Sequence, residues 1–176
     1  MNRAQLEHVI RAASSIANDN EIVVIGSQAI LGFYPEAPGV LCVSEDADVY
    51  PRNFPERADL VDGAIGELSA FHDTFGYYAH GVGPETAILP AAWESRLVHV
   101  TGPGTAGAVG LCLHPLDIAF SKLVAGRQKD IEYLRVMVER GFVQVADLVP
   151  LVGSTALARP AQELMLARLE SLRSPS

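Results

Sequence analysis

Every segment of this chain that has the pattern of a β-strand lies before residue 114, and the pattern is helical from there on. Short β-branched or apolar runs bounded by Gly and Pro are typical of strands, whereas apolar residues three or four positions apart are typical of helices. The change comes at His114-Pro115, because proline suits the first turn of a helix. The sequence therefore predicts an α+β core over residues 1–113 and a helical C-terminal part over residues 114–176, packed together as one compact domain.

The core is expected to alternate between helices and strands. Residues 3–17 have an amphipathic helical pattern, and the β-branched run 21–25 is typical of a buried strand that ends at Gly26. Ser27 can then cap a short helix over residues 28–33. Further strands are expected at 46–50, 77–79, 86–89, 97–100 and 110–113. Further helices are expected at 56–69, with Leu60, Ala64, Ile65 and Leu68 on its inner face, from 115 onward, at 144–152 and at 158–172.

The composition excludes some classes of protein. Lys and Arg total 13 against 21 Asp and Glu, so the formal net charge is −8 and a dedicated DNA-binding protein is not expected. The two cysteines, Cys42 and Cys112, lie in apolar surroundings and are expected to be reduced thiols. No apolar run approaches the ~20 residues of a membrane span, and charged residues interrupt any signal-peptide pattern, so we expect a cytoplasmic protein that does not use a membrane.

Two carboxylates lie close together in the strand expected at residues 46–50. Asp46 and Asp48 project to the same side of a strand, with Cβ atoms roughly 6–7 Å apart. Two ionised carboxylates at that distance repel each other unless a counter-charge lies near both. A divalent cation such as Mg²⁺ or Mn²⁺ would supply that charge, because both ions accept oxygen ligands. A solvated strand without a metal is the alternative.

The end of the first strand offers groups that could bind a phosphate. The apolar run that ends at Ile25 is followed by Gly26-Ser27 and the expected start of a helix. Backbone N–H groups at a helix start attract anions, and a glycine lets a phosphate approach the backbone closely. An ordinary turn with an N-cap is the alternative. Beside the acidic strand, this corner would place a phosphate site next to a metal site.

These residues resemble a known family. Ile25-Gly26-Ser27 followed by Asp46-Ala47-Asp48-Val49 resembles the signature of the polymerase-beta-like nucleotidyltransferase superfamily. The run from Leu113 to Asp130 is similar to the Asp-Leu…Lys-Leu…Arg-x-Lys-Asp segment of the minimal nucleotidyltransferases of toxin–antitoxin and abortive-infection systems. The resemblance implies a mixed β-sheet nucleotidyltransferase core flanked by helices, with an NTP as substrate and Mg²⁺ (or Mn²⁺) as cofactor.

The resemblance also implies roles for single residues. Gly26 and Ser27 would hold the nucleotide phosphates, and Asp46 and Asp48 would ligate the metal and act in catalysis. Lys122 would act with them by reaching the triphosphate. The remaining nucleotide-binding positions that it implies are Arg127, Lys129 and Asp130.

The residues themselves support a basic cluster only under one condition. Lys122 and Lys129 share a helix face if the helix continues through Gly126. The alternative is a solvated face whose basic residues pair with Asp130 or Glu132.

One part of the superfamily pattern is missing. A third carboxylate is expected from a later strand, but the segments 77–80 and 96–100 carry His or Arg instead. The other candidates are carboxylates on weaker patterns, namely Glu85 and Glu94. Three scattered histidines could act as acid–base groups near neutral pH, namely His72, His80 and His99.

Three functions remain open at this level. The first is an enzyme that moves NMP from an NTP to a hydroxyl on RNA or protein, with a cognate antitoxin or toxin as partner. The second is a catalytically degenerate nucleotidyltransferase fold that acts as a binding module or antitoxin, which the missing third carboxylate favours. The third is a protein whose Asp-x-Asp pair is merely solvated.

Overall fold

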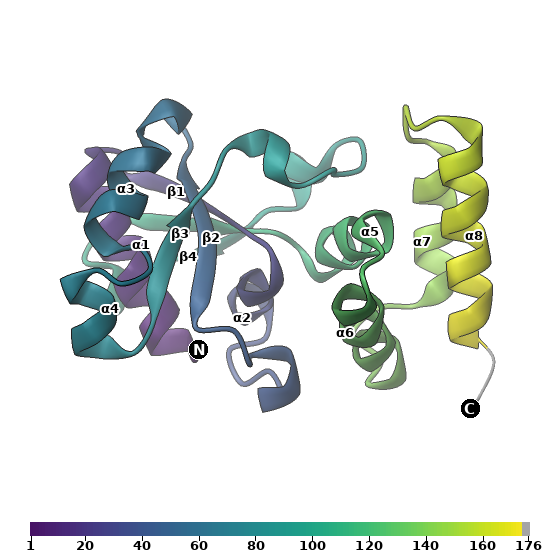
Figure 1. Cartoon of the computed structure of the whole chain (residues 1–176), viewed down its shortest axis with the longest axis horizontal. Helices are drawn as coiled ribbons and strands as arrows, with labels where there is room; N and C mark the ends of the chain where they lie inside the picture. Colours follow the sequence, from purple (N-terminus) through teal and green to yellow (C-terminus); the bar gives the residue numbers. More distant parts are fainter. Residues whose placement is uncertain (174–176) are drawn as a thin grey trace. The chain divides into compact units, whose positions relative to one another are not determined.

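The computed structural model of the chain describes residues 1–173, which divide into two compact units (Figure 1). Unit 1 comprises residues 1–87 and 96–114, and unit 2 comprises residues 88–95 and the chain from 115 onward. Unit 1 contains, in chain order, α1 (Arg3–Ala17), β1 (Glu21–Ile25), α2 (Ile30–Phe33), β2 (Asp46–Pro51), α3 (Ala58–Ile65), α4 (Ala70–Phe75), β3 (Tyr78–Gly81), β4 (Val98–Val100) and β5 (Val109–Cys112). Unit 2 contains α5 (Pro115–Ala125), α6 (Gln128–Glu139), α7 (Val145–Gly153) and α8 (Arg159–Arg173).

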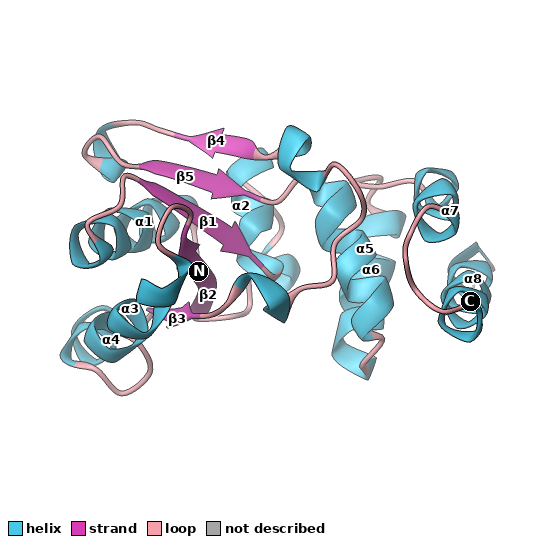
Figure 2. Cartoon of the chain, turned by 90° about the horizontal axis from the view of Figure 1, so that it is seen from above, coloured by secondary structure: helices cyan, strands magenta, loops and turns pink. Residues whose placement is uncertain are grey.

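The strands of unit 1 form a five-stranded sheet in the order β3-β2-β1-β5-β4 (Figure 2). β1 pairs antiparallel with β2 and parallel with β5, while β3 is parallel to β2 and β4 is antiparallel to β5. The sheet is therefore mixed, and it is accompanied by helices and followed by an all-helical C-terminal part. This confirms the predicted α+β fold class.

Three helices cover the same face of this sheet. Val24 is in register with both Val49 and Cys112, so the three side chains share one face. A Cβ at Gly32 in α2 would collide with Cys112, which places α2 on that face. Glycines of the same face approach the other two helices: Gly110 approaches Ile10 of α1, and Gly81 approaches Ala58 of α3. Asp46 and Asp48, which alternate with residues of this face, therefore project from the opposite one.

The first helix follows from its local sequence. The Asn2 side chain accepts a hydrogen bond from the Gln5 backbone N–H at 3.0 Å, and the Gln5 side chain accepts one from the Asn2 N–H at 2.8 Å. This reciprocal capping box satisfies two N–H groups that the first turn leaves unpaired. Asn18 ends the helix with φ +49°, a conformation that Asn tolerates better than most residues. The helix predicted over residues 3–17 is confirmed.

The helix predicted over residues 56–69 is wrong in length and in its inner face. α3 ends at Ile65, because Gly66 leaves the helical conformation with φ −78° and ψ −169°, and α4 begins only at Ala70. Leu68 lies between the two helices at φ +61° and is 83% exposed. Of the four predicted inner-face residues, Ile65 is buried as predicted, and Leu68 falls outside the helix. Leu60 and Ala64 are also exposed, and the buried positions of α3 are Ala58, Val61 and Ile65.

One predicted strand is also wrong. Residues 86–89 form no strand, because Pro84–Thr86 makes a 3-10 turn. Proline cannot donate a ladder hydrogen bond, so a strand that begins beside Pro84 is disfavoured.

Unit 2 is built around α5, which contacts α6, α7 and α8. Ile118, Phe120 and Leu123 of α5 are fully or almost fully buried, and Leu134 and Leu148 from the neighbouring helices are also buried. None of the helices among residues 1–173 combines the length and the apolar composition that a membrane-spanning helix requires.

Candidate functional site

Strand β2 holds two carboxylates on one face. Ala47 and Val49 are fully buried on the helix-covered face, whereas Asp46 and Asp48 are half-buried on the other. Alternation along the strand produces this separation, because successive side chains point to opposite sides. The hydroxyl of Ser44 donates a hydrogen bond to Asp46 Oδ1, so the strand's approach segment orients one of the two carboxylates.

Strand β3 adds a histidine to this pair. β3 runs parallel to β2 with Asp48 in register with His80, so both side chains leave the sheet on the same face. His80 Nδ1 lies 3.0 Å from Asp48 Oδ1. Asp46, Asp48 and His80 each offer one ligand atom, and these atoms lie within 4.8 Å of one another. Among residues 1–173, no other group of three or more Asp, Glu, His or Cys side chains has ligand atoms this close together.

Gly26 brings the end of β1 against the same carboxylates. Ile25 is in register with Asp48, and Gly26 follows with φ +70°, a conformation that side chains rarely adopt. A Cβ at Gly26 would collide with Asp48 Oδ2, so only glycine leaves room for this carboxylate beside the backbone. The predicted proximity of the glycine–serine corner and the acidic strand is therefore present for Gly26 and Asp48.

The segment after Gly26 differs from the prediction. Residues 27–33 form a 3-10 turn, Ser27–Ala29, followed by the short helix α2. No side-chain hydrogen bond caps that turn, and Ser27 is its first residue and not its cap. Gln28 is only 1% exposed, and neither polar atom of its side chain has a hydrogen-bond partner. A buried amide without partners is costly, so this corner is not optimised for folding alone.

The face that holds the three side chains is electrostatically negative. Burial raises the pKa of the Tyr78 hydroxyl, and the charges of nearby carboxylates raise it further. These carboxylates are Asp46, Glu67, Glu45 and Asp48. Negative charges oppose ionisation of a neighbouring phenol and, for the same reason, attract a cation.

The three side chains fit a divalent cation. Atoms bound to one ion at about 2.1 Å lie roughly 3 to 4.2 Å apart, and the 3.0 Å between His80 Nδ1 and Asp48 Oδ1 falls in that range. Two carboxylates and an imidazole are also donors that Mn²⁺ and other first-row ions accept. Neither alternative carboxylate belongs to the group: Glu85 lies in the turn Pro84–Thr86, and Glu94 lies in the segment 88–95 of unit 2. His80 takes the third position.

In the sequence, His80 is one of several scattered histidines. The sequence signal was weak: a His in a strand-like segment where an acid was expected. What brings it to Asp48 is the parallel pairing of β2 with β3, which joins residues 32 positions apart. Local patterns contain no information about that pairing.

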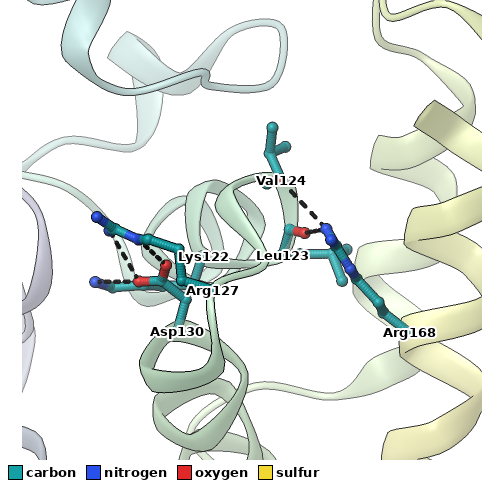
Figure 3. Close-up of polar contacts among 6 residues, drawn as sticks. All are labelled: Lys122, Leu123, Val124, Arg127, Asp130 and Arg168. Atoms are coloured by element: carbon teal, nitrogen blue, oxygen red, sulfur yellow. Dashed lines mark hydrogen bonds and ion pairs between the residues drawn. The ribbon is translucent and has the colours of Figure 1, made fainter.

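The predicted basic residues Lys122, Arg127 and Lys129 lie in unit 2. Figure 3 shows Lys122 and Arg127. α5 ends at Ala125, Gly126 adopts φ +61°, and α6 begins at Gln128. The helix therefore does not continue through Gly126, so the condition under which Lys122 and Lys129 would share one helix face is not met. The pairing with Asp130 that the sequence left as the alternative is present instead. A glycine in this left-handed conformation ends a helix.

Lys122 and Arg127 instead converge on a buried carboxylate. Lys122 Nζ lies 3.0 Å from Asp130 Oδ1, and Arg127 Nε lies 2.6 Å from Asp130 Oδ2. Asp130 is fully buried, and Lys129 is exposed and is not among the groups bonded to it. Burial by itself raises the pKa of Asp130, but the bonds from Arg127 and Lys122 outweigh it and hold the pKa below its usual value. Asp130 is therefore an ionised group that orients both cations.

Comparison with known proteins identified one family. The model of a family described as "Nucleotidyltransferase of unknown function (DUF6036)" matches residues 4–167. No curated protein and no solved structure matches the chain significantly.

Proposed function

The chain belongs to the DUF6036 family of nucleotidyltransferases, and from this premise we propose that it transfers NMP from an NTP to a hydroxyl acceptor with a divalent cation, Mg²⁺ or Mn²⁺, at Asp46 and Asp48. The single observation that supports this most is the convergence of Asp46, Asp48 and His80 beside Gly26. Isolated Asp-x-Asp pairs are common on solvated strands. A strand that is merely solvated would not be expected to have a third potential ligand beside the pair. Nor would it be expected to face a position where Asp48 leaves room only for glycine.

In this reaction the bonds form and break between the acceptor and the nucleotide, and the protein itself forms no covalent bond to either. The acceptor oxygen forms a bond to the α-phosphorus, and the bond from that phosphorus to the bridging oxygen breaks. Pyrophosphate leaves with the bonding pair, and the hydroxyl proton passes to water. A cation bound to Asp46 and Asp48 would neutralise charge on the phosphates. The chain's own residues bind and orient, which is the main requirement of phosphoryl transfer.

Two further sets of residues belong to the proposal through the family resemblance. Gly26 and Ser27 contact the phosphates, where the glycine leaves the backbone open to a close approach. By the resemblance, Lys122 would reach the triphosphate, with Arg127, Lys129 and Asp130 as the remaining nucleotide-binding positions. Asp130 holds Lys122 in place and is itself bonded to Arg127. The buried Asp130 supports this role, because it fixes the position of a lysine that would otherwise be flexible.

The metal and nucleotide site is tested by binding. The variant Asp46→Ala/Asp48→Ala should lose binding of ATP in the presence of Mn²⁺, measured by isothermal titration calorimetry. The matched control is Asp59→Ala/Asp73→Ala, which removes two exposed carboxylates of unit 1 and should bind as the wild type does. Equal binding by the site variant and the wild type would show that the site is wrong.

The role of Lys122 is tested separately. Lys122→Met should weaken ATP binding and leave Mn²⁺ binding unchanged, while Asp130 keeps its bonds to Arg127. Arg135→Met, which removes an exposed cation of α6, is the control. Unchanged ATP binding by Lys122→Met would remove this residue from the proposal.

A second candidate function is a binding module or antitoxin that lacks catalysis. The observation that favours it is the imidazole of His80 at the position where a third carboxylate is expected. Labelled-ATP transfer to total tRNA and to protein distinguishes the two functions. Incorporation by the wild type, lost in Asp46→Ala/Asp48→Ala, would eliminate the second. A small regulator encoded by a neighbouring gene would support the toxin–antitoxin type.

A further inference from the structure

The third member of the candidate metal group differs in chemistry from the other two. We propose that His80 is a direct nitrogen ligand, and that it makes the site select a first-row transition ion, with Mn²⁺ as the representative, over Mg²⁺. This inference rests on the proposed function, because it assumes that Asp46 and Asp48 bind a cation. It adds a residue and an ion preference that the Asp-x-Asp pair alone does not imply.

The backbone sets the position of His80. Parallel pairing puts Asp46 in register with Tyr78 and Asp48 in register with His80. This pairing fixes the backbone of His80 beside Asp48, on the face that holds both carboxylates. The ring nitrogen Nδ1 of His80 lies 3.0 Å from Asp48 Oδ1, which is the separation expected of neighbouring ligands on one ion at about 2.1 Å.

Exposure favours a ligand over a purely structural role. The His80 side chain is 54% exposed, and that of Asp48 is 27% exposed. A hydrogen bond or ion pair this open to water contributes little to stability, so folding alone gives little reason for the pairing. An exposed imidazole beside two carboxylates is, in contrast, accessible to an ion from solution.

The donor set explains the preference. Mg²⁺ loses its water reluctantly and binds through oxygen, so an imidazole adds little to its affinity. First-row transition ions accept imidazole nitrogen readily, and their affinity for nitrogen-containing sites exceeds that of Mg²⁺. The Ser44 hydroxyl, which bonds to Asp46, holds one oxygen ligand from the second coordination layer. Two oxygens and one nitrogen therefore suit Mn²⁺ better than Mg²⁺.

The test is pulsed electron paramagnetic resonance of Mn²⁺ bound to the full chain. A directly bound imidazole produces a ¹⁴N modulation, which the wild type should show. His80→Asp and His80→Gln should both lose it, and Gln does so without adding charge. The control His99→Gln alters an exposed histidine of β4 and should keep the modulation.

Ion selectivity is the second measurement. The ratio of the Mg²⁺ to the Mn²⁺ dissociation constant, obtained by displacement of Mn²⁺, should fall about tenfold or more in His80→Asp, since even second-layer changes alter metal affinity 10–100-fold. Circular dichroism checks that each variant is folded.

The outcomes separate this inference from the proposed function. Mn²⁺ binding that depends on Asp46 and Asp48 but shows no ¹⁴N modulation would overturn the inference and leave the proposed site intact. Equal selectivity in the wild type and His80→Asp would also overturn it. Absence of Mn²⁺ binding, or binding unaffected by Asp46→Ala/Asp48→Ala, would overturn both.

Discussion

Asp19 shows how one buried carboxylate joins two segments of unit 1. It lies in the turn between α1 and β1, is 5% exposed, and accepts hydrogen bonds from the backbone N–H and the side-chain amide of Asn53 at 2.7 and 2.9 Å. The backbone N–H of Glu21 donates a third, at 3.1 Å. Asn53 follows β2, so this carboxylate ties the start of β1 to the end of its partner strand.

These bonds make the stability of the fold depend on pH. Burial by itself raises the pKa of Asp19, but the hydrogen bonds outweigh it and the pKa lies below its usual value. A folded-state pKa below that of the unfolded chain means that Asp19 stabilises the fold above pH ~4, the ordinary pKa of Asp. That contribution is lost as the pH falls through the folded-state value.

We therefore expect Asp19→Ala to lower the free energy of unfolding at pH 7 by about 2 kcal/mol, the scale of hydrogen bonds to a charged group. The difference from the wild type should shrink in acid, below the folded-state pKa. Urea unfolding at pH 7 and in acid measures both. Glu36→Ala, which removes an exposed carboxylate, is the control. A difference that does not change with pH would contradict the assignment.

At the scale of the elements, two residues far apart in the chain, Gly126 and Arg168, together form the C-terminal end of α5. Arg168 of α8 donates hydrogen bonds to the carbonyls of Leu123 and Val124, at 2.8 and 3.3 Å (Figure 3). These carbonyls belong to the last turn of α5, where a helix leaves carbonyls unpaired and favours a cation. A Cβ at Gly126 would collide with the Arg168 guanidinium. Gly126 thus both ends the helix and leaves room for its cap.

This arrangement predicts a coupling between Gly126 and Arg168. Gly141→Ala serves as the control, because Gly141 has φ +74° and a Cβ there meets nothing within 4 Å. Its cost should be about 1–2 kcal/mol, from the left-handed backbone alone. Gly126→Ala should cost about 1 kcal/mol more, the low end of overpacking effects.

A double-mutant cycle checks the origin of that excess. In an Arg168→Ala background, the cost of Gly126→Ala should fall to that of Gly141→Ala, measured by denaturant unfolding. The same excess in both backgrounds would show that the guanidinium is not its cause.

At the level of the whole molecule, the acidic character of the chain bears on its response to metal. The formal net charge is −8, and the three candidate ligands all belong to unit 1. An ion that binds the folded state alone stabilises it by about 2.7 kcal/mol when its concentration is 100 times the dissociation constant. For a chain of this size that is a shift of roughly 5–10 °C in Tm.

We expect Mn²⁺ to raise the Tm in differential scanning calorimetry, and EDTA to reverse the shift. Asp46→Ala/Asp48→Ala should have a Tm that neither addition changes. Equal shifts in the variant and the wild type would show that the ion acts elsewhere on this acidic chain.

Most of the elements could be predicted from the sequence, because a helix or strand depends on residues that are neighbours in the chain. The alternation of Asp46 and Asp48 with buried Ala47 and Val49 placed both carboxylates on one face of β2. Local patterns also predicted α1 and the helical C-terminal part. They failed where a glycine ends a helix inside an apolar run, as at Gly66.

The tertiary structure alone decided which segments meet. The pairing of β2 with β3 places His80 beside Asp48, and the return of α8 places Arg168 at the end of α5. Both contacts join residues more than thirty positions apart. Their free energy comes from burial and hydrogen bonds that form only once the chain has folded, so no periodicity in the sequence records them. The sequence by itself determined the two carboxylates; the fold determined their third partner.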